Sequence, residues 1–107
     1  MQTETPNITY IQKLAGSDIA FQNEFIDIIK NEFPEEQITY HNLLNEEKWK
    51  ETADIVHKIK HKFNILSMHK AYVLGANYEM ELRDGITDKQ TEFEQALQQI
   101  TAFLKTI

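Results

Sequence analysis

Apolar residues recur every three or four positions along almost the whole chain, which is the spacing of amphipathic helices. The best-defined stripe lies within residues 49–66 and consists of Trp49, Ala53, Val56, Ile59, Phe63 and Leu66. No segment alternates apolar and polar residues with the period of two that a half-buried strand shows. The pattern therefore predicts an all-α protein.

Breaks in this pattern divide the chain into helical segments. A short helix is expected over residues 8–14, and longer ones over 19–33, 34–44, 46–66, 68–82 and 88–104. Start signals precede the longer segments: Ser17 with Asp18, Pro34 with Glu35 and Glu36, Asn45, Ser67, and Thr87 or Asp88. Long helices with short connections predict an antiparallel four-helix bundle with an additional short N-terminal helix. A length of 107 residues predicts a single domain over 1–107.

One histidine stands at the edge of the best-defined stripe. His57 is displaced by about a third of a turn from the centre of that apolar face, so its ring should reach solvent. Lys60 lies between His57 and the stripe, and His61 follows one turn later. The sequence thus predicts a partly exposed imidazole in a positive setting, suited to act as a nucleophile toward an anionic group.

The expected reversal near Ser67 gives this imidazole a neighbour. Residues equally distant from the turn lie side by side, so His57 should face the helix around Glu79. A Glu79 carboxylate there would accept the His57 Nδ1 hydrogen and leave Nε2 free. The small Gly75, one turn closer to the loop, would let the two backbones approach.

Charge and composition narrow the functions that fit. Residues 46–70 carry six lysines against four acidic groups, whereas the rest of the chain carries five basic against thirteen acidic groups. Most of the surface would repel nucleic acid, and the local positive patch better suits an acidic site on a partner protein. The chain has no cysteine, which excludes thiolate chemistry, and no apolar run approaches the length of a membrane span. A cytoplasmic monomer is the expectation.

Over nearly its whole length, from the start at residues 14–18 to the last helix, the chain resembles a histidine phosphotransfer (HPt) domain of multistep two-component phosphorelays. That family's motif is a histidine followed by a hydrophobe two residues on, a lysine three on and usually a glycine four on. The residues at these positions here are His57, Ile59, Lys60 and His61. Further matches are Leu66-Ser67 for the family's Leu-Gly, Tyr78-Glu79 for its Leu-Glu, and Lys48-Trp49 for its Asp-Trp.

The resemblance implies a phosphoryl carrier. His57 would take a phosphoryl group from the aspartyl phosphate of a receiver domain and pass it to another receiver. Lys60 would stabilise the transferring phosphoryl group or the acidic cluster of the receiver, and Glu79 would orient the ring. The carrier needs no cofactor of its own, because the partner receiver supplies Mg²⁺. The receiver would dock around His57 and on apolar N-terminal residues such as Ile8 and Ile11.

Departures from the motif leave two other functions open. His61 replaces the family glycine, and Lys62 and Phe63 replace small residues, so the bundle could be a degenerate relative that binds partners without accepting phosphate. His57 and His61 at i, i+4 could also share a metal ion, with Asp54 as a third ligand. The adjacent lysines at 58, 60 and 62 oppose a cation there.

Overall fold

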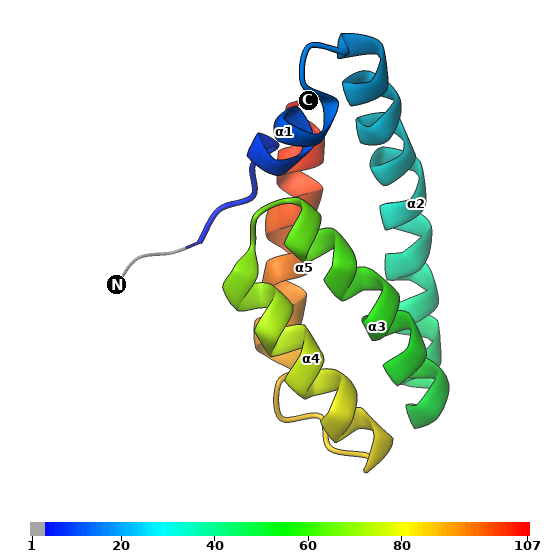
Figure 1. Ribbon diagram of the computed structural model, residues 1–107. Coiled ribbons are helices and arrows are strands. Elements are labelled where there is room, and N and C mark those ends of the chain that lie inside the picture. Colours follow the sequence, from blue (N-terminus) through cyan, green and yellow to red (C-terminus); the bar gives the residue numbers. More distant parts are fainter. Residues whose placement is uncertain (1–3) are drawn as a thin grey trace.

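The computed structural model describes residues 4–107, which form five helices and no strand (Figure 1). The helices are α1 (Thr9–Ala15), α2 (Ile19–Asn45), α3 (Trp49–Ile65), α4 (His69–Arg83) and α5 (Gln90–Leu104). The four long helices alternate in direction, and α1 packs at the end where α3 turns into α4 (Figure 1). The prediction of an all-α bundle with a short N-terminal helix is confirmed. Within residues 4–107, no helix combines the length and the apolarity that crossing a membrane requires.

The expected break at Pro34 is wrong, because α2 runs unbroken for 27 residues with Pro34 inside it. A proline within a helix removes one backbone hydrogen bond and costs about 3 kcal/mol. On this helix Phe33 and Tyr40 are fully buried, on a stripe that continues through Ile26, Ile29 and Leu44. Burial of each large side chain contributes about 1.5–3 kcal/mol. Packing on both sides of the proline therefore outweighs its local cost.

The predicted caps Asn45 and Ser67 are also wrong, because each belongs to the end of the preceding helix. Asn45 is the last residue of α2, and α3 begins four residues later at Trp49. Ser67 follows α3 in the left-handed backbone region, with φ of 65°. Its N–H donates to the Asn64 carbonyl at 3.1 Å, and the Met68 N–H donates to the Phe63 carbonyl at 2.8 Å. These two bonds close the C-terminus of α3 and reverse the chain.

The core lies where α2, α3, α4 and α5 face one another. Tyr40 and Tyr78 are fully buried, and their hydroxyls share a hydrogen bond of 2.7 Å. Both rings contact Phe93, which packs in turn on Phe63. Three phenylalanines lie outside this core: Phe25 and Phe103 are half-buried, and Phe21 is 41% exposed.

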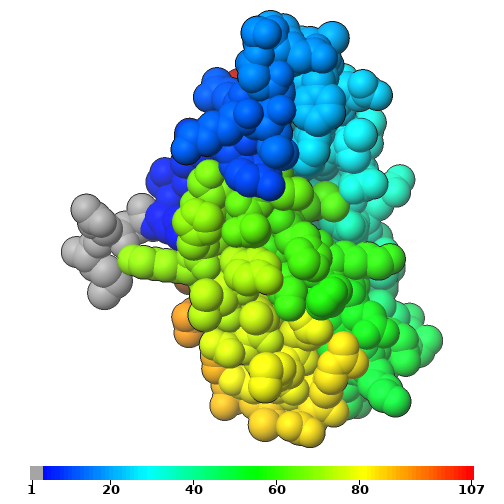
Figure 2. Space-filling model, in the orientation of Figure 1, coloured from blue at the N-terminus to red at the C-terminus, as the bar shows by residue number. Residues whose placement is uncertain are grey.

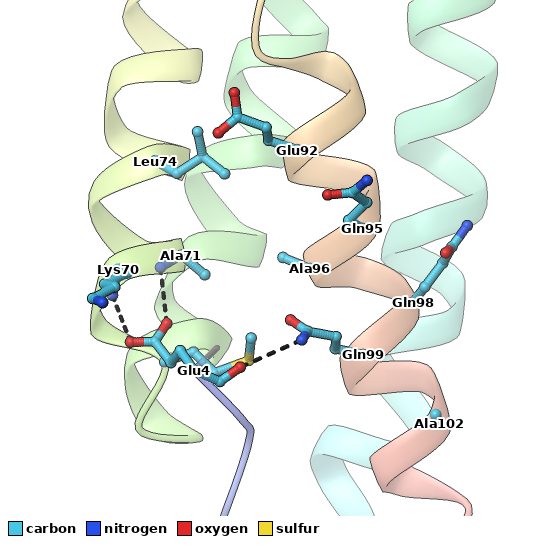
Figure 3. Close-up of a pocket in the computed structure, with 11 residues that line it drawn as sticks. Glu4, Lys70, Ala71, Leu74, Glu92, Gln95, Ala96, Gln98, Gln99 and Ala102 are labelled. Atoms are coloured by element: carbon cyan, nitrogen blue, oxygen red, sulfur yellow. Dashed lines mark hydrogen bonds between the residues drawn. The ribbon is translucent and has the colours of Figure 1, made fainter. Parts of the chain in front are cut away.

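The segment before α1 is tied to the bundle by its backbone and by one carboxylate. The Asn7 N–H donates to the Leu66 carbonyl at 2.9 Å. The Glu4 carboxylate accepts the backbone N–H groups of Lys70 and Ala71 at 2.8 and 3.0 Å (Figure 3). These donors belong to the first turn of α4, whose N-cap residue, Met68, offers no side-chain bond. Glu4 therefore supplies the N-terminal cap that α4 lacks locally.

We predict that Ser67→Gly stabilises the protein by about 1 kcal/mol, since glycine adopts the left-handed region without the steric cost that a Cβ imposes. Chemical denaturation followed by circular dichroism measures the difference. As a matched control, Asn64→Gly at a helical position of the same turn should destabilise. A loss of stability in Ser67→Gly would contradict this account of the α3–α4 reversal.

Candidate functional site

The site begins on α3, whose apolar stripe turns His57 outward. Val56 and Ile59 on either side of it are fully buried, whereas the His57 side chain is 52% exposed. This is the exposed position that the helical pattern predicts. His61, one turn later, is exposed as well. The α3 residues thus place two imidazoles side by side on an accessible surface.

The neighbouring helix α4 comes unusually close at Gly75. A Cβ built on Gly75 would lie 3.0 Å from the Cβ of Lys60 and 3.7 Å from the Phe93 ring. The absence of a side chain therefore sets the spacing between α3 and α4 at this level. Glu79 lies one turn further along α4, opposite His57. The sequence-based expectation for Gly75 agrees with this close approach.

Glu79 contacts His57 as the hairpin register predicts. Its two carboxylate oxygens lie 3.1 and 3.2 Å from the His57 Nδ1. Burial alone would raise the pKa of Glu79, but hydrogen bonds from Lys60 and His57 hold that pKa below its ordinary value. An ionised carboxylate only accepts, so Nδ1 carries the hydrogen and donates it. In the neutral ring, this arrangement leaves the lone pair on the Nε2 atom of His57.

Lys60 is committed to the same carboxylate. Its ammonium donates to Glu79 Oε1 at 2.9 Å and lies 5.6 Å from the centre of the Tyr72 ring. Only 12% of the Lys60 side chain is exposed. In this structure Lys60 therefore holds Glu79 in place beside His57, and its charge reaches the ring through that carboxylate.

Two further charged residues complete the network, and the sequence reasoning did not assign them this place. Arg83 donates to Asp54 at 3.1 Å and approaches Glu79 at 3.5 Å. The i, i+4 spacing of Glu79 and Arg83 on α4 was a signal available in the sequence. Asp54 binds Arg83 and forms no three-ligand cluster with the two histidines within residues 4–107.

His61 lies against the open nitrogen of His57. The two Nε2 atoms are 3.5 Å apart, and the rings meet edge to face at 84° with centroids 5.0 Å apart. Because His57 Nε2 carries no hydrogen in this tautomer, His61 is the donor of this contact. Once the His61 hydrogen moves away, the His57 lone pair can attack an electrophile, and the two rings together can bind a metal ion.

The lysines of the motif do not form one positive surface. Lys62 is only 10% exposed and binds Glu32 and Glu36 of α2, each at 3.0 Å. Lys60 binds Glu79, so only Lys58 of the three is exposed without an ion pair among residues 4–107. The expected repulsion of a cation near His57 is therefore much weaker than the sequence indicates.

A large groove of the described structure lies elsewhere. It has a volume of about 690 Å³ between the Glu4 segment, α4 and α5, and neither His57 nor Glu79 lines it (Figure 3). Within residues 4–107, no group of three or more histidine or acidic side chains is arranged to hold a metal ion. The candidate site is therefore an open surface, in contrast to an enclosing pocket.

Comparisons with protein-family models, with curated proteins and with solved structures found no significant match to this chain.

We predict that Glu79 contributes to stability in a pH-dependent way. Its folded-state pKa is lowered, so its contribution is present above the ordinary value of 4.5 and is lost as the pH falls through the folded-state value. Glu79→Gln should therefore lower the free energy of unfolding at pH 6 and have a smaller effect near pH 3. Urea denaturation of both proteins at the two pH values measures this. An equal difference at both would show that the charge of Glu79 is not stabilising.

Proposed function

We propose that this protein is a phosphoryl carrier that acts with receiver domains. His57 would accept a phosphoryl group from a receiver's aspartyl phosphate and pass it to a second receiver. The observation that carries this proposal is the state of the His57 ring, which is exposed and has Nδ1 bonded to the Glu79 carboxylate. That state leaves Nε2, the nitrogen on the open side, available for in-line attack on phosphorus.

The transfer needs little from this chain beyond position and charge. As the Nε2–P bond forms, the bond from phosphorus to the aspartyl oxygen breaks, and the aspartate leaves as a carboxylate. Positive charge that develops on the imidazole is balanced by Glu79 through the Nδ1 hydrogen bond. The receiver supplies Mg²⁺ and its own charged groups, so the carrier requires no cofactor.

Lys60 would have two roles in this reaction. Its ammonium donates to Glu79 Oε1 at 2.9 Å, which keeps the carboxylate beside the His57 Nδ1. Its positive charge also favours the incoming phosphoryl group and the acidic residues that surround an aspartyl phosphate. The role expected from the sequence, in which Lys60 stabilises phosphoryl or partner charge, thus gains a positioning component.

The partner would dock on the face formed by α3, α4 and α1, which is continuous in the space-filling view (Figure 2). The expectation that Ile11 contacts the receiver is wrong, because Ile11 is the fully buried residue of α1. Ile8 is half-buried, and the apolar side chains that α1 exposes are Tyr10 and Leu14, at 44% and 51%. These two residues replace Ile11 in the proposed receiver contact.

A carrier of this kind would act as a monomer in the cytoplasm.

The alternative is a related interaction module that does not accept phosphate. The observation in its favour is the contact of His61 with the His57 Nε2, since the family has a glycine at that position. The two functions differ in a single measurable property, which is covalent label on His57.

We predict that receiver domains charged with ³²P-acetyl phosphate and Mg²⁺ label the wild-type protein with an acid-labile, base-stable phosphate. His57→Gln should abolish the label while the circular dichroism of the helices is unchanged, because the ring is exposed. His69→Gln, which changes an exposed histidine of α4, is the matched control and should label normally. Equal labelling of His57→Gln, or none from a panel of charged receivers, would refute the proposal.

We also predict that His61→Ala accelerates labelling by a few fold. The hydrogen bond from His61 occupies the lone pair that must attack phosphorus, and such a bond contributes about 0.5–1.5 kcal/mol. Since about 1.4 kcal/mol corresponds to a tenfold rate, the gain should lie between about twofold and about tenfold. Single-turnover kinetics with one charged receiver measure it. Slower labelling would show that His61 assists the transfer.

A further inference from the structure

We propose that His57 and His61 form a two-ligand site for a divalent transition-metal ion, with Zn²⁺ as the representative ion, and that an ion bound there blocks phosphoryl transfer. The binding part rests on the geometry of the two rings alone. The blocking part rests on the proposed function, because it requires His57 to be the phosphoacceptor.

The distance between the two nitrogens fits a shared ion. Two ligands at about 2.0–2.1 Å from a tetrahedral Zn²⁺ lie about 3.3–3.4 Å apart. The Nε2 atoms of His57 and His61 are 3.5 Å apart and already face each other. Both belong to α3 at i, i+4, so the helix backbone holds their Cβ atoms about 5–6 Å apart before any ion arrives. Binding requires His61 to release its Nε2 hydrogen and His57 to keep its present tautomer.

Glu79 completes the arrangement that metal-binding histidines use. Such a histidine usually donates its other ring N–H to a carboxylate, which fixes the tautomer and strengthens the ligand. Glu79 accepts the His57 Nδ1 hydrogen at 3.1 Å and is only 13% exposed. Two further donors, Lys60 and Arg83, hold this carboxylate in position.

The local charge permits a cation. Lys60 is paired with Glu79, Arg83 with Asp54, and Lys62 with Glu32 and Glu36 on α2. The network of Lys60, Glu79, Arg83 and Asp54 therefore carries no net charge, and Lys58 is the lysine of the motif that still adds positive charge. Imidazole suits Zn²⁺, Cu²⁺ and Ni²⁺, whereas Mg²⁺ prefers oxygen ligands and would bind elsewhere.

Two protein ligands leave the remaining coordination positions to water. No third histidine or carboxylate joins the pair among residues 4–107, so the ion should exchange with solvent and would not hold the fold together. The ion and a phosphoryl group require the same Nε2 lone pair of His57. Occupancy by one therefore excludes the other, and the free ion concentration would set the fraction of carrier available for transfer.

The test of binding is calorimetric titration of the untagged protein with ZnCl₂, with Cu²⁺ as a second probe ion. His57→Gln and His61→Gln should each weaken binding by at least about tenfold, and Glu79→Gln by about 10–100-fold, the usual cost of losing a carboxylate behind a ligand. His69→Gln and His41→Gln change exposed histidines outside the pair and should bind as wild type. Equal affinity in wild type and His61→Gln would overturn the site.

The test of blocking is phosphoryl transfer from a charged receiver with and without ZnCl₂. The ion should inhibit labelling of wild type and leave His61→Gln labelled, with the charge state of the receiver measured separately in the same buffer. Inhibition of both proteins alike would overturn the blocking role. Metal binding that depends on His61, in a protein that no receiver labels, would support the site and refute only the proposed function.

Discussion

The close approach of α3 and α4 at Gly75 determines the chemistry available to His57. Because Gly75 has a hydrogen in place of a Cβ, the two helix backbones pack at a distance at which a Cβ would crowd Lys60. One turn along α4, this spacing places the Glu79 carboxylate against the Nδ1 of His57. A wider separation would leave Nδ1 to water and the tautomer of the ring undefined. The geometry of the site therefore depends on packing between helices more than on any property of the histidine.

Glu79 is the centre of the site because its charge is shared among three donors. It accepts from His57, Lys60 and Arg83 and is largely shielded from solvent. Lys60 and Arg83 offset the cost of placing a carboxylate near the helix interface, and His57 gains a fixed orientation from it. Lys62 is likewise paired with opposite charges. It lies on the other side of α3 and joins this helix to α2 through Glu32 and Glu36. Two of the six lysines that read as a basic patch in the sequence, Lys60 and Lys62, are thus used inside the fold.

The sequence predicted what depends on helical period and register. It gave the all-α bundle, the outward position of His57, the small residue at Gly75 and the pairing of His57 with Glu79. It failed where non-local packing outweighs local preference: α2 continues through Pro34 because Phe33 and Tyr40 are buried around it. It also failed at Ser67, since a serine can cap a helix start or occupy a left-handed turn, and only the backbone distinguishes them. The burial of Ile11 and Lys62 depends on how α1 and α2 lie against α3. The apolar periodicity within a single helix does not predict that arrangement.

The central claim concerns one atom, the Nε2 of His57. It is tested most directly by NMR of ¹⁵N-histidine-labelled protein after phosphorylation by a charged receiver, with the coupling between ³¹P and each ring nitrogen resolved. The account predicts phosphorus bonded to Nε2 of His57, with the Nδ1 hydrogen retained toward Glu79. Phosphorus on Nδ1 of His57, or on His61, would contradict it.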